Sequence, residues 1–436
     1  MVKLNTLVYQ LLKALDIYYP DFYIMVNVNN NKNKLFRKLN ISKIVTNPKN
    51  LAASITFKRE QNIRKKINKI GRKIYGILKR PNLPYNVNRM RGDRDVCAAV
   101  GEFSPAPIDS IKLWPPIVLA PMAGVTDLAY RILARECGAD VTVTEFTAAS
   151  GLTRKNTYSW LKVESDPRES PFIPQIFGGI TEEMVQTVEM LQDRADVIDI
   201  NFGCPAPKVC RNDAGAALLR DPDRVVSMVR ACIEVAEVPI TVKMRLGTGS
   251  GPNTALEICE RLEQEGVERV CVHGRTLRQR YSGEADWSQI REISESVGIE
   301  VIANGDVTDS SSALECLEAT GATGLMIGRG AIGRPSIFHE IKRDLGWTTS
   351  APPWGEGGDA IARLWCWDRY LEIAHEVYSD SPNKNLKRHA VSFTKGLPGA
   401  SSMRVELHRE GDQRKLGEMV SDYLAELATP AKASAI

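Results

Sequence analysis

Eight short apolar segments recur along residues 117–330, and this repetition constrains the fold more than any other feature of the sequence. Strands that alternate with helices require crossover connections, and these connections produce a parallel sheet. The segments have the length of buried strands, and they are IVLAPM (117–122), VTVTEF (141–146), FIPQIFG (172–178), VIDINFG (197–203), ITVKMRLG (240–247), RVCVHGRT (269–276), EVIANGDV (300–307) and GLMIGRG (324–330).

Most of the gaps between these segments have the apolar spacing of helices. The clearest helical patterns are TEEMVQTVEMLQDR (181–194), DPDRVVSMVRACIEVA (221–236), NTALEICERLEQEG (253–266) and SSSALECLEATG (310–321). Eight strand–helix units predict an α/β fold, a (β/α)₈ TIM barrel over residues 113–346. A doubly wound open sheet is the alternative, but no G-x-G-x-x-G follows the first strand.

The sequence after the barrel changes character. The Pro-, Gly- and Trp-rich residues 347–358 predict a linker, and 359–430 predict a small all-helical domain with helices at 361–378 and 415–428. Between those two helices the chain is basic. Residues 384–415 hold eight Lys and Arg against three Asp and Glu.

The first hundred residues differ in charge from the rest. They hold 21 Lys and Arg against 5 Asp and Glu, whereas the whole chain has a formal net charge of only +4. We therefore treat residues 1–110 as a separate basic extension, with a cationic amphipathic helix predicted at 58–80. The extension is either an RNA- or membrane-surface arm or an addition that the folded part does not need.

Several classes of protein are excluded by simple counts. No apolar run reaches the roughly 18 residues of a membrane span. The sequence has nine Cys, an odd number, and no C-x-x-C motif, which disfavours a disulfide framework and a zinc site. The five His are scattered. We expect a cytoplasmic protein with no metal and no membrane partner.

Unusual polar residues and glycines stand where the predicted strands end. In a TIM barrel the carboxyl ends of the strands carry the functional residues, and the last two loops often bind phosphate. The residues at these ends are Pro121, Met122, Ala123, Gln175, Asn201, Lys243, His273, Asn304, Gly305, Asp306, Gly328 and Arg329.

Lys243 lies within the apolar segment TVKMRL, and a buried Lys needs an anionic partner. That partner is either a carboxylate on a neighbouring strand, such as Glu145 or Asp199, or a bound anionic group such as a reduced flavin. His273 also has two alternatives: it either contacts a bound anionic group or is an ordinary core histidine.

Cys204 directly follows the fourth strand, between Gly203 and Pro205. Glycine permits unusual backbone angles and proline fixes the turn, so this thiol is presented at the mouth of the barrel. Its position alone is compatible with a nucleophile or with an acid that delivers a proton.

Short strings in a fixed order give a more specific indication. Residues 115–345 contain APMAGVTD, QIFGG, DINFGCPAPKV, AGAALL, TVKMRLG, VHGRT, YSG-x-A-x-W, VIANGDV and LMIGRGAIGRP. Together they closely resemble the tRNA-dihydrouridine synthases of bacteria and archaea. The string RHAVSFTKGLPGASSMR (388–404) is more loosely similar to the helical tRNA-binding domain of that family. The extension 1–110 has no counterpart in the usual members.

The resemblance implies an oxidoreductase in which FMN, reduced by NADPH, passes a hydride to carbon 6 of a tRNA uracil while a Cys protonates carbon 5. Cys204 would be that acid, and Asn201 would hold the uracil. The implied FMN contacts are Pro121, Met122, Ala123, Gln175, Lys243, His273, Asn304, Gly305, Asp306, Gly328 and Arg329. The implied tRNA contacts are Lys208, Arg211, Arg275, Arg278, Lys387, Arg388, Lys395 and Arg404.

Two other functions remain open at this point. One is an FMN barrel that resembles dihydroorotate dehydrogenases and acts on a free pyrimidine, and the other is an RNA-binding protein without catalytic activity. We expect a monomer in which deletion of residues 1–108 costs little activity.

Overall fold

The computed structural model describes residues 116–378 and 385–429, and all of them fall within one compact unit of the chain. The predictions for residues 1–110 lie outside the described residues, as does Lys384. In the described part, no helix is both long enough and apolar enough to cross a bilayer.

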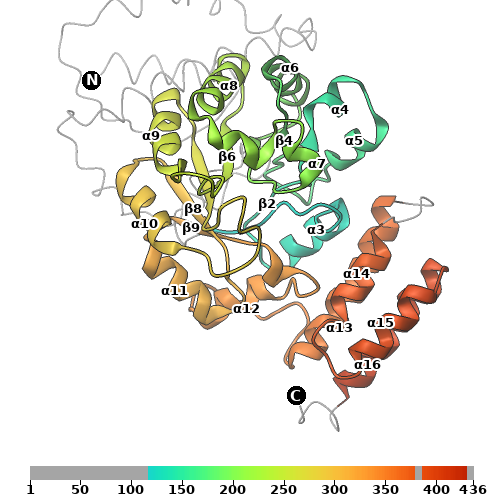
Figure 1. The fold of residues 1–436 in the computed structure, drawn as a ribbon. Helices are drawn as coiled ribbons and strands as arrows, with labels where there is room; N and C mark the ends of the chain where they lie inside the picture. Colours follow the sequence, from blue (N-terminus) through green and yellow to red (C-terminus); the bar gives the residue numbers. More distant parts are fainter. Residues whose placement is uncertain (1–115, 379–384, 430–436) are drawn as a thin grey trace, which may run out of the picture. The chain divides into compact units, whose positions relative to one another are not determined.

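The centre of the fold is a single parallel sheet (Figure 1). Its strand order is β2-β1-β9-β8-β7-β6-β5-β4-β3. The strands are β1 (Ile117–Leu119), β2 (Val141–Thr142), β3 (Thr147–Ala148), β4 (Gln175–Phe177), β5 (Ile198–Phe202), β6 (Ile240–Arg245), β7 (Arg269–His273), β8 (Glu300–Asn304) and β9 (Gly324–Ile327).

The two ends of this strand order belong to one stretch of chain. The predicted second strand, 141–146, is shorter than expected: β2 pairs with β1, and β3 pairs with β4. Between them, the Thr144 N–H donates to the Ile173 carbonyl at 3.1 Å. The strands therefore run through a full circle, and the predicted (β/α)₈ barrel is confirmed.

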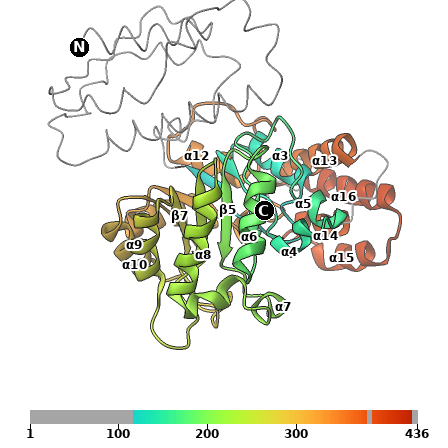
Figure 2. The same ribbon diagram turned by 90° about the horizontal axis from the view of Figure 1, so that it is seen from above.

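Helices cover the outside of the sheet (Figure 2). In the barrel portion they are α3 (Leu128–Glu136), α4 (Ala149–Thr153), α5 (Thr157–Lys162), α6 (Thr181–Leu191), α7 (Pro207–Cys210), α8 (Pro222–Val235), α9 (Ala255–Glu265), α10 (Trp287–Ser296), α11 (Ser310–Thr320) and α12 (Ile337–Asp344), with 3₁₀ turns η7 (Gly215–Arg220) and η8 (Arg329–Ala331). All four helical patterns singled out in the sequence form helices here. The short α4 and α5 were not predicted.

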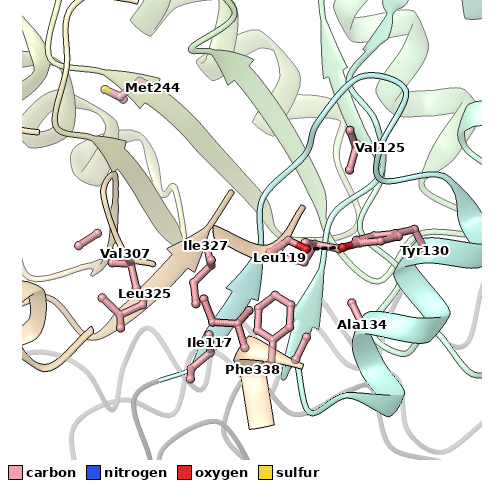
Figure 3. Packing of buried hydrophobic residues seen from close by; sticks show 14 of the residues in the cluster. Ile117, Leu119, Val125, Tyr130, Ala134, Met244, Val307, Leu325, Ile327 and Phe338 are labelled. Atoms are coloured by element: carbon pink, nitrogen blue, oxygen red, sulfur yellow. Dashed lines mark hydrogen bonds between the residues drawn. The ribbon is translucent and has the colours of Figure 1, made fainter. Parts of the chain in front are cut away.

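Alternate residues of each strand point to two different cores, because successive side chains of a strand face opposite sides. One set packs between the strands and the helices; Figure 3 shows Ile117 and Leu119 of β1 close to Leu325, Ile327 and Phe338. The other set fills the inside of the barrel and comprises Val118, Ala120, Val141, Val143, Ile173, Val197, Cys271, Ile302 and Met326. The barrel interior is therefore a packed core and not a pore.

The described residues after the barrel form four further helices, which Figure 1 shows as a group on the side of α3. They are α13 (Asp359–Tyr378), α14 (Leu386–Phe393), α15 (Ala400–Arg409) and α16 (Gln413–Ala428). The expected helices at 361–378 and 415–428 are present, and the basic stretch between them forms α14 and α15. The division into a barrel at 113–346, a linker at 347–358 and a helical domain at 359–430 stays a prediction.

A buried carboxylate joins these helices to the barrel. Asp127 is 7% exposed and caps α3 by accepting the Tyr130 N–H at 3.0 Å. One of its oxygens also contacts His389 Nε2 and accepts from the Tyr370 hydroxyl, both at 3.1 Å. Burial raises the pKa of Asp127, but the charge and hydrogen bond of His389 and the hydrogen bonds of Tyr130 and Asn385 together outweigh burial, so the pKa lies below its usual value.

Removing this carboxylate should loosen the contact between the barrel and the C-terminal helices. We expect Asp127→Ala to lower the free energy of unfolding by about 3–5 kcal/mol, because partners buried around it lose their acceptor. Because the folded pKa of Asp127 is lowered, its stabilisation is present above about pH 4 and is lost as the pH falls further. Urea unfolding at pH 7 and at pH 3 measures both effects.

The matched control is Asp166→Ala, which removes an ion pair with Arg168 near the surface and should cost about 0–1 kcal/mol. An equal effect of the two substitutions at pH 7 would show that Asp127 does not hold the interface.

Candidate functional site

The polar residues predicted at the strand ends continue the rows of side chains that face the barrel interior. The strand register places Gln175 beside Asp199, and Asn201 beside Lys243. It also places His273 between Arg245 and Asn304. Because parallel strands end at the same edge, the fold brings these predicted residues together at one end of the barrel.

A chain of hydrogen bonds runs across three of these strands. The Asp199 carboxylate accepts from the Thr241 hydroxyl and from Gln175 Nε2, each at 2.6 Å. Gln175 Oε1 in turn accepts from Asn201 Nδ2 at 2.7 Å. Every member is buried, so each amide has its orientation fixed by a specific partner.

This chain of hydrogen bonds ends at the loop that carries Cys204. Asn201 Oδ1 accepts the backbone N–H groups of Gly203 and Cys204, both at 2.9 Å. From the other side, Arg245 Nε donates to the Gly203 carbonyl at 2.9 Å. The loop that carries the thiol is thus held through two backbone N–H groups and one backbone carbonyl.

The Cys204 side chain is 5% exposed. Burial raises its thiol pKa above the usual value, despite the backbone contact of Ala206 and the positive charge of Arg245. The thiol therefore stays protonated at neutral pH, as an acid must.

Lys243 is a buried cation, 8% exposed. Its ammonium donates to Asn304 Oδ1 at 2.9 Å, and Asn304 Nδ2 donates to the Met326 carbonyl at 2.7 Å. Neither predicted carboxylate pairs with it, because Asp199 is bound as above and Glu145 pairs with Lys162 at 3.5 Å. The ion-pair alternative for Lys243 was therefore wrong.

His273 stands among cations. Burial lowers its pKa far below the usual range, and the neighbouring positive charges lower it further; they belong to Lys243, Arg245, Arg275 and Arg329. The imidazole is therefore neutral at physiological pH. Its Nε2 lies 3.4 Å from Arg275 Nη1.

The loop after β8 has a constrained shape. Gly305 has φ +125°, and a Cβ there would lie 2.8 Å from the Ala285 Cβ and 3.0 Å from His273. Asp306 adopts φ 61°, which few non-glycine residues do. Its carboxylate holds this conformation by binding Arg275 at 2.6 Å and Arg329 at 3.0 Å.

Arg275 follows β7, as expected, but it is buried. It is 2% exposed, and besides Asp306 it donates to the Gly283 carbonyl at 2.6 Å. Its guanidinium is used to fix the loops after β7 and β8, so we assign it to the support of the site and not to contact with tRNA.

The loop after β1 meets the C-terminal helices. The Ala123 carbonyl accepts from Arg388 Nη1 of α14 at 2.7 Å, and Gly124, at φ +69°, leaves the room that this guanidinium occupies. Pro121 and Met122 are half-buried beside it. One predicted tRNA contact, Arg388, thus touches a predicted cofactor contact.

The other predicted tRNA contacts lie on or near the surface. Lys208 and Arg211 are exposed at α7, and Arg278 is exposed with a 2.9 Å bond to Ser250. Lys395 is exposed, Lys387 donates to the His408 carbonyl at 3.2 Å, and Arg404 is half-buried.

Two participants were missed as site residues. Arg245 alternates with Lys243 in an apolar strand, and that spacing was the available signal. Tyr281 is 55% exposed, with its ring 5.5 Å from the Arg245 guanidinium and 5.1 Å from that of Arg329. Nothing in its sequence context placed it at the mouth.

The charge of the site fits an anionic cofactor such as FMN. Four cations, Lys243, Arg245, Arg275 and Arg329, surround the neutral His273, while Asp306 neutralises only part of that charge. In the described part of the chain, no carboxylate lies within ion-pair distance of Lys243, so an anionic group would find a partner there. No group of three metal-binding side chains is present among the described residues.

Comparison with known proteins agrees with this arrangement. A probable tRNA-dihydrouridine synthase of Rickettsia conorii is 35% identical over 322 residues, which are 72% of this chain and 95% of that protein. The tRNA-dihydrouridine synthase B of Klebsiella pneumoniae is 36% identical and covers 64% of this chain and 85% of its own. That of Pseudomonas aeruginosa is 35% identical over 71% of this chain and 93% of its own.

A family model described as dihydrouridine synthase matches residues 118–428, which span the barrel and all four C-terminal helices. The chain belongs to the dihydrouridine synthase family.

Proposed function

We propose that this chain is an FMN-dependent tRNA-dihydrouridine synthase, which reduces the 5,6 double bond of tRNA uridines with NADPH. The observation that carries the proposal is the pairing of two groups on neighbouring strands. The protonated Cys204 thiol follows β5. Lys243, which lies on β6, has no carboxylate within ion-pair distance among the described residues, and burial lowers its pKa. The names of the curated relatives supply the substrate.

FMN would supply the hydride, taken from NADPH, that adds to carbon 6 of the uracil. Lys243 would face the flavin ring and balance its negative charge. Arg329 and the glycines of the last two loops would hold the phosphate. The remaining contacts would be Pro121, Met122, Ala123, Gln175, His273, Asn304, Asp306 and Gly328.

Cys204 would complete the reduction. Its thiol gives a proton to carbon 5 as the hydride arrives at carbon 6, and the thiolate left behind takes a proton from solvent. Asn201 Nδ2 has a second N–H that the Gln175 bond does not use, and this group would hold the uracil.

The uracil has to leave its stack in the tRNA to reach a site at the barrel end, which costs a few kcal/mol. Exposed cations around the mouth would offset this cost through contacts with phosphates. Lys208, Arg211 and Arg278 would act from the barrel, and Lys387, Arg388, Lys395 and Arg404 from α14, α15 and the turn that joins them. We propose a cytoplasmic monomer.

Substrate choice separates this proposal from a barrel that reduces free pyrimidines. We expect NADPH-dependent reduction of transcribed tRNA and none of free uridine, because the cationic surface contributes only with a polyanion. Mass spectrometry of dihydrouridine in both reactions measures this. Reduction of the free nucleoside alone would overturn the proposal, and a purified protein without flavin absorbance near 450 nm would indicate a non-catalytic RNA-binding protein.

Removing the thiol should affect the tRNA step alone. We expect Cys204→Ala to keep its flavin and its reduction by NADPH, while oxidation by tRNA slows by at least about 100-fold, since a general acid contributes that much. Stopped-flow absorbance resolves the two steps. Because the pKa of Cys204 is raised, the wild-type tRNA step should stay level from pH 6 to about 8.5 and fall only above it.

An unchanged tRNA step in Cys204→Ala would refute the acid role. The control is Cys232→Ala: that thiol is fully buried in α8, and its loss should leave both steps near wild type.

Lys243 tests the cofactor assignment without turnover. We expect Lys243→Met to weaken FMN binding by at least about tenfold, because the anionic group loses a buried partner. Fluorescence titration of the apo-protein with FMN measures the affinity. Lys155→Met, at an exposed site after α4, serves as the control. Equal affinity of the two variants would remove Lys243 from the cofactor site.

A further inference from the structure

Asp199 has no part in the proposed chemistry, yet it is buried at the centre of the site. It is 6% exposed and has no Lys or Arg within ion-pair distance among the described residues. Both of its oxygens are used: Oδ1 accepts from Thr241 and Oδ2 from Gln175. Burial raises its pKa, and these two hydrogen bonds together with the charges of Lys243 and Arg269 oppose that effect. A buried carboxylate is costly, so its retention here calls for a reason.

The reason lies in the direction of the hydrogen bonds. Because Asp199 Oδ2 is an acceptor at this position, Gln175 turns its Nε2 toward Asp199 and its Oε1 toward Asn201. Asn201 then donates through Nδ2, which leaves its Oδ1 facing the N–H groups of Gly203 and Cys204. The acceptor Asp199, at one end of this hydrogen-bond chain, therefore determines that Asn201 Oδ1 faces the Cys204 loop at the other end.

We propose that Asp199 is a positioning residue, which holds the Cys204 thiol in place through Gln175 and Asn201. The role of that thiol rests on the proposed function, but the positioning does not. Without the carboxylate, Gln175 Nε2 is a buried donor with no partner and rotates to find one. Asn201 then loses its acceptor, and the Cys204 loop keeps its contacts with Arg245 at Gly203, with the Ala216 N–H on the Cys204 carbonyl at 3.2 Å and with the Cys210 thiol on the same carbonyl at 3.6 Å.

Three substitutions separate acceptor direction from charge and volume. Asp199→Leu keeps the branched shape of the side chain and removes the acceptor. Asp199→Asn removes the charge but keeps an oxygen for Gln175, because the Thr241 hydroxyl accepts as well as donates and takes the new N–H. Thr241→Val leaves the carboxylate facing Gln175. We expect only Asp199→Leu to release the loop.

Alkylation of Cys204 by iodoacetamide reports the loop directly and needs no flavin or tRNA. Trypsin cleaves after Lys208, so that Cys204 and Cys210 are measured on separate peptides. We expect the Cys204 rate to rise at least about tenfold in Asp199→Leu, the factor that corresponds to one lost buried hydrogen bond. Asp199→Asn and Thr241→Val should stay within about threefold of wild type.

The tRNA step gives a second readout. In Asp199→Leu it should slow at least about tenfold, with a smaller change in reduction by NADPH, and Asp199→Asn should restore it. Unchanged alkylation in Asp199→Leu, or equal effects of the Leu and Asn variants, would overturn the proposal. If the wild type fails to reduce tRNA, the proposed function is wrong and alkylation alone still tests Asp199.

Should Asp199→Leu fail to fold, Gln175→Met breaks the same chain one link further on. Alkylation is then the readout, because Gln175 belongs to the proposed cofactor contacts. The rise at Cys204 should match that expected for Asp199→Leu, and an unchanged rate would contradict the chain of hydrogen bonds as the means of positioning.

Discussion

The closed parallel ladder governs the rest of this molecule. Once the strands form a ring, alternate side chains have to face either the helices or a narrow interior that water does not fill. Most of the interior positions are apolar, and the polar residues of the site lie at the end where the strands lead into their loops. A lysine, an aspartate and three amides are thereby confined to a dry space in which each needs a defined partner. The rigidity of the site is a consequence of that confinement.

Strand number, helix positions and the edge that carries the site could be predicted from the sequence, since period and length are local properties. The position at which the strand pairing is interrupted, between β2 and β3, could not be predicted. The segment VTVTEF has the composition of one strand, yet it forms only the two-residue β2, and its pairing continues at β3. That depends on the neighbours at either side, which no local pattern describes.

For the site residues, the location of each side chain was easier to predict than the residue with which it forms a hydrogen bond or ion pair. Lys243 was expected to be buried, and it is, but its partner is an amide and not a carboxylate. Arg275 carries a charge that is typical of a surface contact, yet the loops after β7 and β8 close over it. In both cases the outcome depends on which of several equally spaced residues lies on the adjacent strand. Spacing along one segment does not contain that information.

The bond between Arg388 and the Ala123 carbonyl bears on how such a protein can be divided or recombined. It ties the C-terminal helices to the loop that follows the first strand, and Asp127 does the same a few residues further on. The helices after the barrel are thus not an exchangeable attachment. A chimera that takes its C-terminal helices from a distant relative would have to bring a matching arginine and histidine, or replace the first loop as well.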